Sequence, residues 1–141
     1  MEVQVNYLAV VLAGLSSMLV GSIWYAQGVF GKVWAKLARV DMSGTPKASA
    51  IIRLMGLTLL ASLVTAFVLA HVASLSQQYF NGSFLQNTLS TAFWMWLGFT
   101  ALRILTHDLF EGRPFKLTLI TWGNEIVTIM LMGLIIGLMG V

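Results

Sequence analysis

Residues 115–139 read FKLTLITWGNEIVTIMLMGLIIGLM, and this stretch decides the fold. Lys116 and Glu125 are its only charged residues, and long apolar runs surround them. A helix needs about 20 mostly apolar residues to cross the roughly 30 Å hydrocarbon core of a bilayer. Strands of a membrane barrel would instead alternate apolar and polar side chains. The stretch therefore predicts a membrane-spanning helix.

Three other runs have the same character, namely residues 5–27, 54–75 and 87–106. The composition supports this interpretation, because 58% of the 141 residues are hydrophobic and only 9% are charged. A typical soluble domain carries about 25% charged residues. A soluble fold of this length could not bury so much apolar surface. We predict one all-α membrane domain over residues 1–141, built as a four-helix transmembrane bundle.

The eight lysines and arginines lie beside only two connections between the predicted spans. They occur between the first and second spans and around the connection between the third and fourth, whereas the loop 76–86 and both chain ends carry none. The positive-inside rule makes the two basic connections cytoplasmic, so we expect an N-out/C-out topology. The net charge of +3 then reflects the basic residues of the two cytoplasmic connections and does not indicate nucleic-acid binding. We expect the lipid bilayer as a partner and no nucleic acid.

The first basic connection contains a predicted amphipathic helix over residues 29–40. Apolar residues recur there at helical spacing, and the basic residues occupy the other side. Such a helix lies on the inner leaflet with its basic face toward anionic head groups. The interfacial candidates are Trp34, Lys32, Lys36 and Arg39. The helix serves either as a simple anchor or as a gate or partner-binding surface.

Small residues predict how the spans pack. Lipid tails compete with apolar side chains, so association of membrane helices depends on close approach at small residues. Stripes of such residues occur in the first span (Ala9, Ala13, Ser17, Gly21), the second (Thr58, Ser62, Ala66, Ala70) and the fourth (Gly133, Gly137). We expect the first two spans to pack together. The two glycines serve an internal contact or a dimer seam, and we expect a homo-oligomer or a membrane protein partner.

A carboxylate near the middle of the fourth span is the most informative polar residue. Glu125 lies about 15 Å along that helix at 1.5 Å per residue, where a charge is costly unless it is paired, protonated or hydrated. The other intramembrane polar candidates are Asn124, Thr121, Thr128 and Arg103. Arg103 either reaches Glu125 or extends toward the interface. Glu125 is either a proton- or cation-responsive site or a structural group that joins helices.

The sequence offers little for catalysis. It contains no cysteine, which excludes disulfides, thiol chemistry and cysteine-ligated metals. His107 and Glu111 have a spacing that suits a metal, but beside Asp108 and Arg113 they more often form an ion-pair turn. No nucleophile–base pair is evident. We expect no enzyme activity, no catalytic residues, no cofactor and no metal site.

Several landmarks resemble the pattern of one family. They are Asn6-Tyr7-Leu8-Ala9-Val10, Trp24-Tyr25 followed by Phe30-Gly31-Lys32-Val33-Trp34, residues 93–99 (FWMWLGF) and residues 110–116 (FEGRPFK). Together they span essentially the whole chain and resemble the small, mainly bacterial membrane proteins known as domain of unknown function 1761. Where that pattern has a proline soon after the tyrosine, this chain has Ala26-Gln27. The resemblance implies a multi-pass, four-span protein of the bacterial cell (inner) membrane and carries over no catalytic residue.

Two functions from different classes follow from these observations. The scarcity of polar groups favours a structural or accessory component of the membrane, in an oligomer or beside another protein. The alternative is a small proton- or cation-coupled transporter or channel that uses Glu125.

Overall fold

The computed structural model describes residues 3–41, 44 and 47–140, and all regular structure in these ranges is helical. The predicted all-α class is therefore confirmed. The elements in chain order are α1 (Tyr7–Trp24), the π-helical turn η1 (Gln27–Gly31), α2 (Lys32–Leu37), α3 (Ala48–Tyr79), α4 (Phe84–Met95), the π-helical segment η2 (Trp96–Ala101), α5 (Leu102–Phe110) and α6 (Phe115–Met139).

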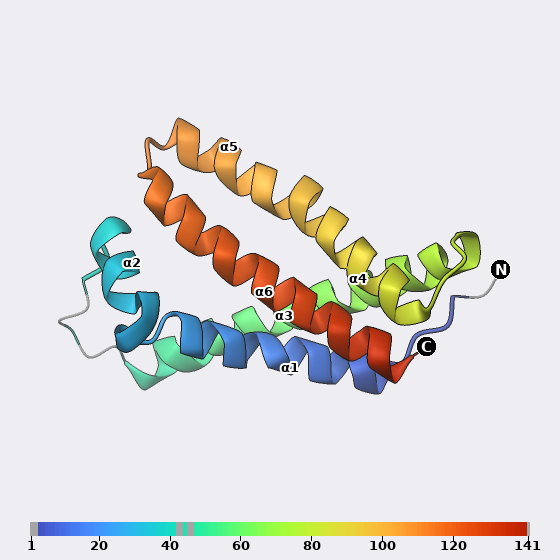
Figure 1. The fold of residues 1–141 in the computed structure, drawn as a ribbon. Coiled ribbons are helices and arrows are strands. Elements are labelled where there is room, and N and C mark those ends of the chain that lie inside the picture. Colours follow the sequence, from blue (N-terminus) through green and yellow to red (C-terminus); the bar gives the residue numbers. More distant parts are fainter. Residues whose placement is uncertain (1–2, 42–43, 45–46, 141) are drawn as a thin grey trace.

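Three of these helices, α1, α3 and α6, are long and apolar enough to cross a membrane by length and composition. They contain most of the predicted spans 5–27, 54–75 and 115–139. The predicted span 87–106 falls instead on three consecutive segments, α4, η2 and α5, each shorter than 18 residues. These segments follow one another without a break and run as one rod in Figure 1. The interruption at η2 was not visible in the hydropathy of the sequence.

The long helices surround one core in an up-and-down arrangement (Figure 1). α1 packs against α3 and α6, and α4 packs against the same two helices. We call the end with the chain termini and the α3–α4 loop the closed half, and the end with α2 and the α5–α6 turn the open half. In the open half, α5 diverges from α3 (Figure 1).

Small residues let the helices of the closed half approach each other closely. Ala9 and Ala13 of α1 and Ala66 of α3 are fully buried. On α6, a Cβ at Gly133 would lie 3.1 Å from the Ala92 Cβ, and one at Gly137 would lie 2.9 Å from the Leu85 Cα. Both glycines therefore face α4 of the same chain. Of the two roles considered for them, an internal helix contact or a dimer seam, the structure shows the internal contact.

The segment after α1 turns sharply and then forms a short helix. Residues 29–40 were expected to form one helix, but the α-helix ends at Leu37, and Arg39 adopts a left-handed φ of 56°. The turn requires glycine at Gly31, because a Cβ there would collide with the carbonyl oxygen of Tyr25. Lys32 and Lys36 are exposed, whereas Trp34 is half-buried and meets the Tyr25 ring edge-on at 5.3 Å.

The α5–α6 turn is fixed by backbone and side-chain hydrogen bonds. Gly112 has a φ of 65°, and the Arg113 N–H donates to the Asp108 carbonyl at 2.9 Å, which is the glycine-ended geometry expected at a helix C-terminus. The Asp108 carboxylate is buried and accepts a hydrogen bond from the Thr118 hydroxyl at 2.6 Å. Arg113 pairs with Glu111 at 2.6 Å and reaches Asp108 at 3.8 Å.

Candidate functional site: a polar cavity between the helices

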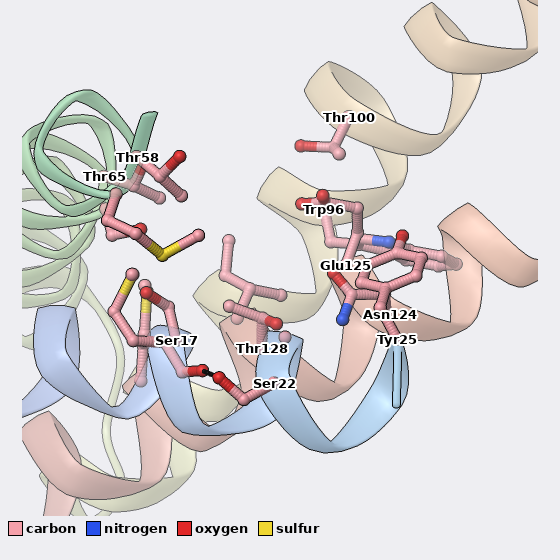
Figure 2. A pocket seen from close by; sticks show the side chains of 16 residues that line it. Ser17, Ser22, Tyr25, Thr58, Thr65, Trp96, Thr100, Asn124, Glu125 and Thr128 are labelled. Atoms are coloured by element: carbon pink, nitrogen blue, oxygen red, sulfur yellow. Dashed lines mark hydrogen bonds between the residues drawn. The ribbon is translucent and has the colours of Figure 1, made fainter. Parts of the chain in front are cut away.

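A cavity of about 600 Å³ lies between α1, α3, η2 and α6 (Figure 2). Most of its lining side chains carry a polar group, although they belong to helices with apolar outer faces. The lining consists of Ser17, Met18, Gly21, Ser22 and Tyr25 from α1 and its C-cap, Met55, Thr58, Ser62 and Thr65 from α3, Trp96 and Thr100 from η2, and Asn124, Glu125, Thr128, Ile129 and Met132 from α6.

Glu125 is the acidic side chain of this cavity. Among the described residues that line it, there is no other acidic residue and no lysine or arginine. The Tyr25 hydroxyl is close enough to interact electrostatically with Glu125, and it is hydrogen-bonded to the Thr121 side chain. The Thr121 hydroxyl itself bonds to the Leu117 carbonyl at 3.1 Å, one turn earlier in α6. A carboxyl group and a phenol therefore share one wall of the cavity.

Trp24 holds this end of α1 against α6. Its indole N–H donates to the Ile120 carbonyl at 3.1 Å, and its ring covers Gly123, where an added Cβ would lie 2.6 Å from the Trp24 Cζ2. The Phe30 ring also contacts the Trp24 ring, tilted by 34° with the ring centroids 4.7 Å apart. Tyr25 follows as the C-cap of α1, so these contacts fix the position of its hydroxyl beside Glu125.

Two buried N–H donors of the cavity lining have no hydrogen-bond partner within the described chain. They are the Trp96 indole Nε1 and the Asn124 amide Nδ2. Asn124 is only 8% exposed, so its amide has little access to bulk water. Most buried polar groups in proteins are paired, and each exception calls for an explanation. Figure 2 shows Trp96 and Asn124 beside Glu125 and Tyr25.

The opposite wall presents hydroxyl oxygens. Thr58 and Thr65 of α3 donate to the carbonyls of Leu54 and Ala61 in their own helix, at 2.8 and 3.0 Å. Ser17 of α1 donates to Gly14 in the same way, at 2.7 Å. Because these hydroxyl hydrogens are already used, the oxygens remain as acceptors toward the cavity. Figure 2 shows this hydroxyl wall facing the cluster around Glu125.

The structure brings some of the predicted site residues together and separates others. Asn124, Glu125 and Thr128 line the cavity, and Thr121 lies beside it through Tyr25. Arg103 is exposed on α5, and no ion pair joins it to Glu125 among the residues that the structure describes. The predicted packing stripes divide in the same way. Their closed-half members are buried, whereas Ser17, Gly21, Thr58 and Ser62 line the cavity.

Sequence reasoning did not identify Tyr25 and Trp96 as site residues. Both residues stood out in the sequence only as parts of the family landmarks. A weak signal existed in the hydroxyl-rich stripe of residues 58–66, which was read as packing surface. Small hydroxyl side chains suit both a tight helix contact and a wetted cavity, so the stripe alone could not distinguish these roles.

The fold and the cavity define a class of protein: an all-helical membrane protein with a polar, carboxylate-bearing cavity between its helices. The family described as "Protein of unknown function (DUF1761)" matches residues 8–137. The chain therefore belongs to this family, and the resemblance seen in the sequence is confirmed. Comparison with curated proteins and with solved structures gave no match.

Proposed function

We propose that this protein binds a small cationic solute in the cavity beside Glu125 and carries it across the bilayer. The observation that carries this proposal is the charge balance of the cavity. Among its described lining residues one carboxylate is present without a cationic partner, and hydroxyl acceptors face it. A carboxylate inside a membrane domain is costly unless it is paired, protonated or hydrated. A cation on the ligand would supply the pairing charge.

The proposal includes four spans, with the α4–η2–α5 run as the fourth crossing segment. We further propose that α2 and the α5–α6 turn lie in the cytoplasm and that both chain ends lie outside, in the inner membrane of a bacterial cell. Lys32, Lys36, Arg113 and Lys116 support this orientation, because the elements that carry them lie at the same end of the bundle (Figure 1).

Glu125→Gln is the variant that tests the proposal. It removes the negative charge and keeps the size of the side chain. Propylammonium is a suitable first probe, since it carries one positive charge on a short apolar chain. We expect saturable binding of propylammonium to the wild-type protein in mild detergent, measured by calorimetry, and at least a tenfold weaker affinity in the variant, as expected for loss of a charged partner. Uptake of the same probe into proteoliposomes should fall in parallel.

Glu111→Gln provides a matched control. Glu111 is an exposed carboxylate in the α5–α6 turn, paired with Arg113 and outside the cavity lining. The Glu111→Gln protein should bind and transport propylammonium as the wild type does. The proposal is wrong if wild type and Glu125→Gln bind and transport the probe equally well.

The second candidate function is a structural or accessory membrane component, alone as an oligomer or beside another membrane protein. The exposed apolar face of α3 supports it, because large side chains such as Ile52, Leu57 and Leu60 are more than half exposed there. A surface of that kind meets either lipid or another protein. This candidate predicts that Glu125→Gln is tolerated and that a defined assembly survives mild extraction, with no catalysed reaction in either case.

A further inference from the structure

The unpartnered donors Trp96 and Asn124 bear on the chemistry of the solute. Glu125 recognises a positive charge, but an ammonium group cannot accept a hydrogen bond from an indole or an amide N–H. A ligand that satisfied only the carboxylate would therefore leave the Trp96 Nε1 and the Asn124 Nδ2 without partners. Leaving buried donors unpaired is unfavourable, so these two groups select for a ligand that also carries an acceptor.

The charge of the cavity decides which acceptor fits. Among the described lining residues Glu125 is the one carboxylate that can pair with an ammonium group, and no basic side chain is present. A zwitterion would place its own carboxylate beside Glu125, and like charges in a poorly hydrated site repel each other strongly. A neutral carbonyl oxygen accepts from Trp96 and Asn124 without that repulsion.

We propose that the solute is a small primary amine bearing a neutral hydrogen-bond acceptor, an amino amide or amino ester, held by Glu125 at its ammonium and by Trp96 and Asn124 at its carbonyl oxygen. This assignment rests on the proposed cation-binding function of the same cavity. It adds a second contact point, and so it predicts discrimination among ligands of equal charge and similar size.

Three probes separate these contributions. Propylammonium has the charge without an acceptor, glycinamide has the charge and a neutral carbonyl, and glycine has a carboxylate in place of the amide. At about pH 7 the amino groups of all three are largely protonated, since α-amino groups titrate near 8 or above. We expect calorimetry on the wild-type protein in mild detergent to show glycinamide binding about tenfold more tightly than propylammonium, as one or two net hydrogen bonds would give. Glycine should bind more weakly than either.

Variants of the two donors then test their role. Trp96→Phe keeps an aromatic ring and removes the indole N–H, and Asn124→Leu keeps the approximate volume and removes the amide. The measured quantity is the ratio of the propylammonium and glycinamide dissociation constants, which should fall from about ten toward one in either variant. Trp94→Phe is the matched control, because Trp94 lies two residues away on the same rod and is 64% exposed. Its ratio should equal that of the wild type.

The outcomes distinguish this inference from the function on which it rests. If propylammonium binds in a Glu125-dependent manner but glycinamide shows no preference, the acceptor subsite is wrong and the cation site stands. The same conclusion follows if glycinamide is preferred and the ratio survives in both Trp96→Phe and Asn124→Leu. If neither amine binds the wild-type protein, both the proposed function and the acceptor subsite are overturned.

Discussion

The two halves of the bundle differ in the contacts that join their helices. In the closed half, alanines and glycines allow helices to touch, as Ala13 does on α1 and Gly137 on α6, and the Asn87 amide of α4 donates to the Gln77 side chain of α3 at 2.7 Å. In the open half, side chains bridge the helices with hydrogen bonds. Trp24 donates to the Ile120 carbonyl at 3.1 Å, Trp122 to the Ala101 carbonyl at 2.9 Å, and Thr118 to the Asp108 carboxylate at 2.6 Å.

This difference accompanies the position of the cavity around Glu125, which is lined by α1, α3, η2 and α6. Contact through small residues brings helix axes close together. A second hollow, of about 650 Å³, lies along α3 and α4 on the closed-half side and contains no acidic or basic side chain among its described lining residues. Gly137 and Gly21 show the contrast between a packed position and one beside the cavity. A Cβ at Gly137 would meet Leu85, whereas one at Gly21, beside the cavity, would meet no heavy atom within 4 Å.

The largest effect on stability should come from adding a methyl group in the closed half. In Gly137→Ala the new Cβ would lie 2.8 Å from the Leu85 Cδ1 and 2.9 Å from its Cα, so the α4 backbone must move. We expect the free energy of unfolding in detergent to fall by about 2–3 kcal/mol, within the range for overpacked sites. Denaturant titration of the purified protein measures it.

Gly21→Ala makes the same chemical change at the open end. Its Cβ enters free space, so the free energy of unfolding should stay within about 0.5 kcal/mol of the wild-type value. Equal losses in the two variants would contradict the distinction between the halves.

An intermediate effect is expected where a hydrogen bond joins α5 to α6. Thr118→Val preserves the shape of a side chain that is 1% exposed and removes the donor to the buried Asp108 carboxylate. The carboxylate then loses a short hydrogen bond, which should cost about 1–2 kcal/mol in the free energy of unfolding. Thr106→Val is the control, since the exposed Thr106 hydroxyl bonds to the Leu102 carbonyl of its own helix, at 2.9 Å. A Thr118→Val protein as stable as the control would show that this bond does not stabilise the open half.

The sequence predicted the features that the bilayer itself imposes. The length and apolarity of α1, α3 and α6 follow from the thickness of the hydrocarbon, so they could be read from single segments. Glu125 was identified for a related reason, because a carboxylate in an apolar run is conspicuous. The role of Gly133 and Gly137 in helix packing followed from their spacing, although their partner helix α4 did not.

The features that depend on contacts between segments could not be read in this way. The π-helical segment η2 contains no proline, and its neighbour in space, Trp122, is distant in sequence. Tyr25 and Trp96 carry aromatic rings that suit a lipid interface equally well, and only the packing of α1, η2 and α6 directs them toward Glu125. Ala13 and Ser17 belong to one stripe of small residues on α1. Ala13 is buried between helices, whereas Ser17, one turn later, lines the cavity, and the stripe itself does not mark this change.

The smallest effect should appear at the bond between η2 and α6. Trp122→Phe keeps an aromatic ring near Trp96 and Phe115 but removes the donor to the Ala101 carbonyl, whose residue is 1% exposed. The loss of one neutral hydrogen bond should lower the free energy of unfolding by about 1 kcal/mol. Trp94→Phe, at an exposed position without a bridging role, should change it by less than about 0.5 kcal/mol. If both variants are equally stable, the π-helical segment keeps its place through packing alone, and the open half resembles the closed half more than its hydrogen bonds indicate.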